Sequence, residues 1–107
     1  MATSKEYYEF IMEQLGETDD VSSRAMMGEY IIYYKDKVAG GIYDNRFLIK
    51  PVDSAKRLMP DAPLQLPYEG AKPMLLVDNV DNRDFLKTLF ESIYDELPSP
   101  KPKKKDL

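Results

Sequence analysis

The sequence predicts a two-layer α+β fold in which helices cover one face of an antiparallel sheet. Apolar residues recur at helical spacing near both ends of the chain, and strand-like segments with short polar turns lie between them. The helical segments stand before and after the strands rather than alternating strictly with them, which argues against a parallel sheet. We expect the 107 residues to form one domain at residues 1–98, followed by a disordered basic tail at residues 99–107.

The first helix is expected directly after Thr3, because Thr3 and Glu6 have the spacing of a capping box. Gly16 suits the C-terminal cap of this helix, and the polar residues 17–20 are expected to form a loop. The apolar positions that share one face of the helix are Tyr7, Phe10, Ile11 and Leu15.

The central region has the pattern of an antiparallel meander. Its first and longest strand contains Gly28, which we expect to form a bulge or a bend. Asp and Asn at the second turn tolerate positive φ at little cost, and Pro51 ends the last strand. The expected strands are residues 24–35, 38–43 and 46–50, joined by turns at residues 36–37 and 44–45.

The second half of the chain alternates short elements with a proline-punctuated connection at residues 60–73. We expect a helix at residues 53–58 with Asp53 as its N-cap, a buried strand at residues 74–77, and a last helix capped by Asp81. The apolar stripe of that last helix consists of Phe85, Leu86, Leu89, Phe90, Ile93, Tyr94 and Leu97.

The composition limits the chemistry of the protein. The chain has no His, Cys or Trp, which excludes a Ser-His-Asp or Cys-His nucleophile within the chain and the usual Cys/His zinc sites. No loop has the acidic spacing of a calcium-binding hand. Acidic loops such as residues 17–20 are usually only solvated. We therefore expect no enzyme, no catalytic residues, no cofactor and no metal.

Charge is divided unevenly along the chain. Residues 1–98 hold 11 Lys and Arg against 18 Asp and Glu, a net charge of −7, so the body should repel a phosphate backbone. The tail is basic and carries Lys101, Lys103, Lys104 and Lys105, which could contact an acidic partner or nucleic acid weakly, or simply aid solubility. No apolar run is long enough to span a bilayer or to form a secretory signal, so we expect a cytoplasmic protein without membrane contact.

The segment from Met26 to Lys37 is apolar on both of its expected faces. Tyr30, Ile32 and Tyr34 fall on one face, and Ile31 and Tyr33 fall on the other with Glu29 and Lys35. With Gly41 and Tyr43 nearby, the second face predicts an exposed apolar patch, of the kind that usually contacts a partner. Such a face can also be an ordinary solvated surface. The candidate partner-binding residues are Ile31, Tyr33, Tyr43, Met27, Glu29 and Tyr30.

Two lysines precede prolines next to expected chain reversals: Lys50 before Pro51 and Lys72 before Pro73. Each lysine can cover apolar surface with its stem while its ammonium stays in water. If the fold brings Lys50 and Lys72 together, they can instead form a cradle for a small anion or an acidic peptide.

Four motifs in order resemble the TfoX/Sxy N-terminal domain family of bacterial competence regulators. They are Met26-Met27-Gly28-Glu29-Tyr30, Asp36-Lys37-Val38, Lys50-Pro51 and Pro67-Tyr68-Glu69-Gly70-Ala71-Lys72-Pro73, and the likeness extends over about residues 4–97. Met27 stands where the family usually has Phe, a tolerable exchange for an apolar site. The resemblance covers the N-terminal domain only, without the C-terminal helix-hairpin domain of the full-length regulators.

The resemblance implies a secretion-chaperone-like fold: an antiparallel five-stranded sheet in the order α-β3-α-β2-α, with helices on one face. The fifth strand would come from the proline-rich segment, around Leu64–Tyr68. It also implies a regulatory role in DNA transformation or transcription. The residues themselves support a non-enzymatic module that buries its Tyr/Ile face in a homodimer or against another protein. The alternatives are a nucleic-acid-binding protein of a related sheet-and-loop type and a small enzyme that uses carboxylates.

Overall fold

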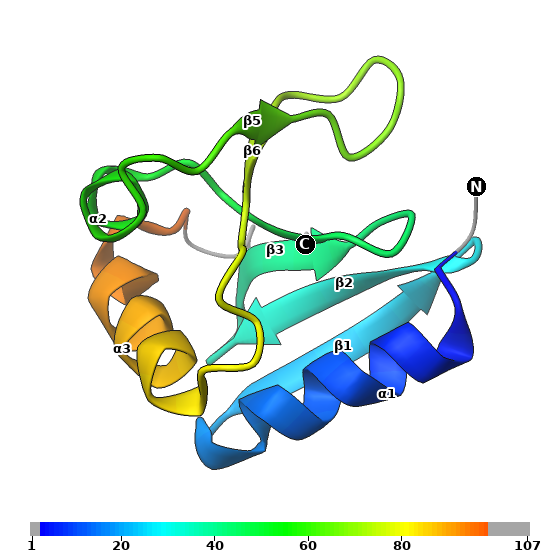
Figure 1. Ribbon diagram of the computed structural model, residues 1–107, viewed down its shortest axis with the longest axis horizontal. Coiled ribbons are helices and arrows are strands. Elements are labelled where there is room, and N and C mark those ends of the chain that lie inside the picture. Colours follow the sequence, from blue (N-terminus) through cyan, green and yellow to red (C-terminus); the bar gives the residue numbers. More distant parts are fainter. Residues whose placement is uncertain (1–2, 99–107) are drawn as a thin grey trace, which may run out of the picture.

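The computed structural model describes residues 3–98, apart from the side chain of Glu17. Helices and strands are arranged as an α+β fold (Figure 1). The helices are α1 (Lys5–Gln14), α2 (Asp53–Leu58) and α3 (Arg83–Ile93), with 3-10 turns η1 (Leu15–Glu17) and η2 (Tyr94–Glu96). The strands are β1 (Val21–Met26), β2 (Glu29–Tyr34), β3 (Lys37–Ile42), β4 (Phe47–Ile49), β5 (Leu64–Gln65) and β6 (Met74–Leu76).

Within residues 3–98, six strands form one sheet in the order β1-β2-β3-β4-β6-β5, and every neighbouring pair is antiparallel. The expected α+β class is confirmed, but the expected five strands in the order α-β3-α-β2-α are wrong. Along the chain, four strands come before α2 and two strands come after it. The additional strand expected near Leu64–Tyr68 is present as β5, which pairs with β6.

The extra strand arises from the segment expected to be one strand at residues 24–35. Met27 and Gly28 have φ of 52° and 88°, and Met26 pairs with Glu29, so these two residues form a tight hairpin rather than a bulge. Positive φ at both central positions is the condition for a type I′ turn, whose twist matches that of the flanking strands. A methionine at the first position is not a turn signal, which explains why the sequence suggested one long strand.

Two further two-residue turns with positive φ connect β2 to β3 and β3 to β4. They are Lys35-Asp36 and Asp44-Asn45. The second turn lies where it was expected, and the first lies one residue earlier. A register shift between Ile32 and Tyr33 adds a bulge to the β2–β3 pair.

The N-cap of each long helix lies one residue after the expected cap. The Tyr7 backbone N–H donates to Ser4 Oγ at 3.1 Å, and the Phe85 N–H donates to Asn82 Oδ1 at 3.0 Å. Ser4 and Asn82 are therefore the N-caps, in place of the expected Thr3 and Asp81. The hydroxyl of Thr3 is used elsewhere, because it donates to Glu29 Oε1 at 2.6 Å.

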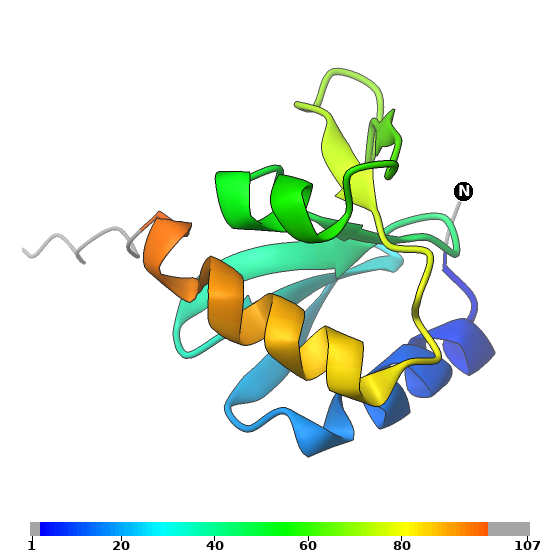
Figure 2. The ribbon, with the colours of Figure 1, turned by 60° about the vertical axis from the view of Figure 1, so that its left-hand side comes forward.

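One apolar core lies between the sheet and the helices α1 and α3, which sit on the same side of it (Figure 2). Phe90 of α3 is fully buried, and its ring centroid lies 5.5 Å from that of Tyr34 and 6.3 Å from that of Phe47. The expected stripe of the last helix is confirmed, because Leu86, Leu89, Phe90, Ile93 and Leu97 are all buried. The opposite surface of the sheet is called the outer face below.

Candidate binding face

The outer face is defined by the strand register. Ile32 and Tyr34 are buried in the core, so the alternate residues Ile31 and Tyr33 point the other way. Ile31 pairs with Arg24 on β1 and with Gly41 on β3, and Gly41 in turn pairs with Leu48 on β4. The expected placement of Ile31 and Tyr33 on the face opposite Ile32 is therefore confirmed.

One half of the outer face, over β3 and β4, is closed by the chain itself. A Cβ added to Gly41 would lie 2.4 Å from Tyr43 Cε2, so the Tyr43 ring lies directly on the backbone of Gly41. Tyr43 is 7% exposed and Leu48 is fully buried. The ring of Tyr68, from the proline-rich loop, lies 6.0 Å from that of Tyr43. The expected single exposed patch including Gly41 and Tyr43 is therefore too large.

Arg46 fastens the loop after β5 to this half of the sheet. Its Nη1 donates to Gln65 Oε1 at 3.0 Å, its Nη2 donates to the carbonyl of Pro67 at 3.4 Å, and its Nε donates to the carbonyl of Tyr43 at 3.2 Å. A planar guanidinium presents five donors in a fixed fork, so it can hold three separated acceptors at once. Sequence reasoning missed both Arg46 and Tyr68 as parts of the site.

Burial of Tyr43 affects its chemistry. The pKa of its phenol is raised, first because burial disfavours the phenolate, and further by repulsion from the charged forms of Tyr68, Glu29 and Tyr33. The Tyr43 side chain is therefore neutral near physiological pH.

The other half of the outer face, over β1 and β2, is open. Ile31 and Tyr33 are half-buried, Met26 is 38% exposed, and Met27 at the hairpin tip is 99% exposed. Tyr33 borders an open depression of about 380 Å³ with Ser22, Ser23, Arg24 and Asp36. The apolar surface that remains available to a partner is therefore centred on Ile31, Tyr33, Met26 and Met27, which we call the open patch.

Glu29 and Tyr30, also expected among the partner-binding residues, make contacts within the chain. Glu29 Oε1 accepts hydrogen bonds from the hydroxyl of Thr3 at 2.6 Å and from the N–H of Asp44 at 3.0 Å. It thereby ties the start of the chain and the β3–β4 turn to the β1–β2 hairpin. Tyr30 lies on the helix-covered face, where its ring stacks on Tyr8 with 3.9 Å between centroids. Neither residue belongs to the open patch.

The fold brings Lys50 and Lys72 to the same cavity, which has a volume of about 390 Å³. Its walls also include Tyr43, Tyr68 and Glu96. Several prolines line it as well, from the segment after β4, the proline-rich loop and the end of the described chain: Pro51, Pro67, Pro73 and Pro98. This cavity is called the lysine groove below. The lysines expected in the tail, at positions 101, 103, 104 and 105, lie outside the described residues.

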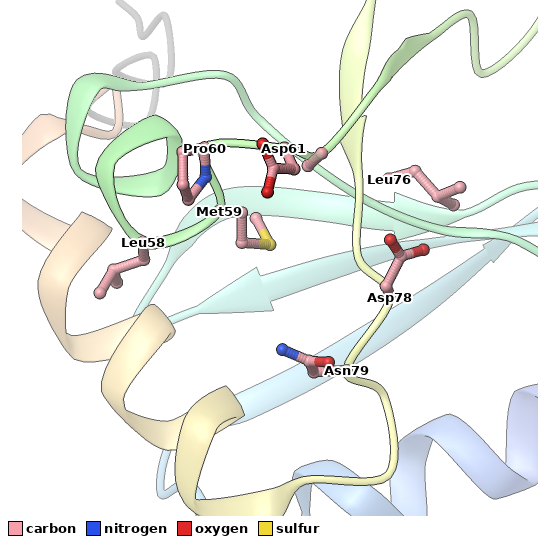
Figure 3. A pocket seen from close by; sticks show the side chains of 8 residues that line it. Leu58, Met59, Pro60, Asp61, Leu76, Asp78 and Asn79 are labelled. Carbon is pink, nitrogen blue, oxygen red and sulfur yellow. The ribbon is translucent and has the colours of Figure 1, made fainter.

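A second cavity of about 200 Å³ lies between the end of α2 and the segment after β6. Figure 3 shows that the carboxylates of Asp61 and Asp78 and the amide of Asn79 border it, with Met59 and Leu76 among its apolar residues. Its charge is opposite to that of the lysine groove. Throughout residues 3–98, no three His, Cys, Asp or Glu residues are grouped so that they could hold a metal ion.

Comparison with known proteins finds a relative that matches most of the chain. The chain is 35% identical over 105 residues to an uncharacterized 12.7 kDa protein in the trpE 5′ region of Spirochaeta aurantia, covering 97% of this chain and 91% of the relative. No family model matches the chain, and no solved structure matches it either. No helix within the described residues is long and apolar enough to cross a membrane. On this identity and coverage, the chain belongs to the same family as the Spirochaeta aurantia protein.

Proposed function

We propose that the protein is a non-enzymatic, cytoplasmic regulatory module that forms a homodimer through the open patch. The observation that supports this proposal is the uneven cover of the outer face. The half over Gly41, Tyr43 and Leu48 is closed, with the Tyr43 ring on Gly41 and the Tyr68 ring of the proline-rich loop 6.0 Å from it. Ile31, Tyr33 and two methionines remain partly or fully exposed. Apolar side chains exposed near one another on one face often mark a protein interaction site.

The open patch suits association with a second copy. Tyrosine and methionine are enriched at protein interfaces, because Tyr combines an apolar ring with a wet hydroxyl and Met adapts to irregular surfaces. A two-fold symmetric contact needs only one self-complementary patch. Arg24 on β1 and Asp36 in the β2–β3 turn are opposite in charge and border the same depression as Tyr33. They can therefore pair across a two-fold axis.

The regulatory role is proposed from the likeness of four sequence motifs to the TfoX/Sxy N-terminal domain family, which links the protein to bacterial competence and transcription. An antiparallel sheet with α1 and α3 on one side of it (Figure 2) supports the likeness at the level of fold class, although the six strands differ from the five of the expected arrangement. In the absence of His and Cys, binding rather than catalysis is the function that the residues support best.

Sedimentation over a range of protein concentrations tests the homodimer. We expect the wild-type protein to shift from monomer to dimer between micromolar and millimolar concentrations. Tyr33→Glu places a charge at the centre of the open patch and should weaken association by at least about tenfold. The matched control is Thr88→Glu, which adds the same charge at an exposed position of α3 and should leave association unchanged. A wild-type protein that stays monomeric throughout would refute the homodimer.

A further inference from the structure

The lysine groove combines features that are not needed for dimerisation through the open patch. We propose that the groove binds a small organic anion with an aromatic body, its ring against Tyr43 and Tyr68 and its charged group toward Lys50 and Lys72. This ligand site goes beyond the proposed function and does not depend on it. The proposal follows from the walls, the charge and the size of the groove.

Aromatic and proline side chains form the apolar part of the groove wall. Tyr43 is held in place by its contact with Gly41, and the Tyr68 ring is tilted by 54° relative to it, with 57% of Tyr68 exposed. The prolines have fixed φ and no rotatable side chain, so ordering them around a ligand costs little entropy. Aromatic pairs prefer such offset or tilted contacts, so the exposed Tyr68 ring can accept a third ring.

The charge of the groove favours an anion. Neither Lys50 nor Lys72 forms an ion pair with any side chain that the structure describes, although residues 1–98 carry a net charge of −7. The carboxylate that also lines the groove, Glu96, is already bound: it accepts hydrogen bonds from the hydroxyl and the N–H of Ser54 and lies 3.8 Å from Arg57. The two free ammonium groups therefore determine which charge the groove attracts.

The size of the groove suits a small molecule. Ligand cavities in proteins usually measure about 300–1,000 Å³, and the groove measures about 390 Å³. The cavity in Figure 3 is half as large and is bordered by Asp61 and Asp78, which would repel an anion. The acidic cavity therefore serves as a control within the same molecule, because an anionic ligand should bind to the lysine groove and not to the acidic cavity.

Titration of the full chain with simple probes, followed by amide chemical shifts, tests the site. We expect phenyl phosphate and phenylacetate to shift the amide signals of Lys50, Val52, residues 68–72 and Met74. Neutral phenylacetamide and inorganic phosphate should each bind at least about tenfold more weakly, because one lacks the charge and the other lacks the ring. Equal binding of phenylacetamide, or shifts confined to the acidic cavity, would overturn the proposal.

Three variants locate the ligand. Lys50→Gln/Lys72→Gln should weaken phenyl phosphate binding by about tenfold or more, because both charges are removed while the stems remain. Tyr68→Leu should weaken it by several-fold, since an exposed ring is replaced without disturbing the core. The control is Lys87→Gln, at an exposed position of α3 outside the groove, which should bind as the wild type does. Unchanged binding in the double lysine variant would overturn the proposal, whatever the sedimentation experiment shows.

Discussion

Met27 occupies the first turn position between β1 and β2 with a φ of 52°, and it is 99% exposed. The first fact costs free energy, and the second provides no stabilisation. The left-handed conformation is unfavourable for any residue with a Cβ, and an exposed methionine gains nothing from burial. Strained, exposed apolar residues persist where they serve a function. This pairing of backbone strain and exposure agrees with the place of Met27 in the open patch.

Replacing Met27 with Asn should therefore raise stability and lower association together. Asn tolerates positive φ and makes the preferred Asn-Gly turn with Gly28, so Met27→Asn should raise the free energy of unfolding by about 1 kcal/mol. Urea denaturation at low protein concentration measures this change. Met27→Leu keeps the strained backbone and should show no gain. A loss of stability in Met27→Asn would show that the Met27 side chain makes contacts that stabilise the folded monomer.

At single positions, the sequence predicted the face on which a side chain lies better than it predicted the contacts that the side chain makes. Ile31 and Tyr33 were assigned to the correct face from alternation alone. Glu29 and Tyr30 were assigned to a partner, but their contacts are with Thr3, Asp44 and Tyr8. Those contacts join residues far apart in the sequence, so no local pattern could reveal them.

Among the elements, α2 shows how a short helix is capped from a distance. Its N-cap position is Val52, which has no side-chain acceptor, so the expected capping by Asp53 is wrong. The N–H of Ser54 instead donates to Glu96 Oε1 at 2.9 Å, and the Ser54 hydroxyl also donates to Glu96. A carboxylate at a helix N-terminus is favourable both as an acceptor and through the helix dipole.

This contact makes the stability of the protein sensitive to acid. The hydrogen bonds from the Ser54 side chain and backbone, followed by the charge of Arg57, hold the pKa of Glu96 below its usual value of 4.5. A pKa that is lower in the folded state stabilises the fold above the unfolded value, and the stabilisation is lost as the pH falls through the folded value. The Glu96 contribution should therefore be complete at neutral pH and disappear below about pH 4.5.

Thermal denaturation across this pH range provides the measurement. Glu96→Gln should have a lower Tm than the wild type at neutral pH, and the two Tm values should converge in acid, where the wild-type carboxyl is also neutral. Glu91→Gln, which removes an exposed carboxylate of α3, should not show this convergence. A constant difference between wild type and Glu96→Gln at all pH values would contradict the assigned role of the Glu96 charge.

The elements that the sequence predicted well are those with local signals. The turn at Asp44-Asn45, the helix at residues 53–58 and the buried stripe of α3 all agree with the structure, because turn residues and periodicity act over a few positions. The hairpin at Met27-Gly28 was missed, since its first residue is not a turn former. β5 is only two residues long, and its existence depends on pairing with β6.

At the scale of the whole molecule, the lysine groove was the feature least accessible from sequence. Lys50 and Lys72 line the same groove because β4, which precedes Lys50, pairs with β6, which follows Lys72. Arg46 also holds the loop between β5 and β6 in place through Gln65 and Pro67. Both causes are long-range. The two Lys-Pro dipeptides are visible in the sequence, but only the fold determines whether both lysines line one site.

The single core predicts that the domain unfolds as one unit. Leu89 is fully buried in a cluster that joins α1, α2, α3 and the sheet. Leu89→Ala should lower the free energy of unfolding by about 2–5 kcal/mol, through lost burial and the cavity that remains. The control, Thr88→Ala, truncates the exposed neighbour on the same helix and should change the free energy of unfolding by less than about 0.5 kcal/mol.

Tyrosine fluorescence and far-UV circular dichroism should give coincident transitions for both variants, because strands and helices share this core. Separate transitions for the β1–β4 meander and the β5–β6 pair would show instead that the sheet is stabilised in two independent parts.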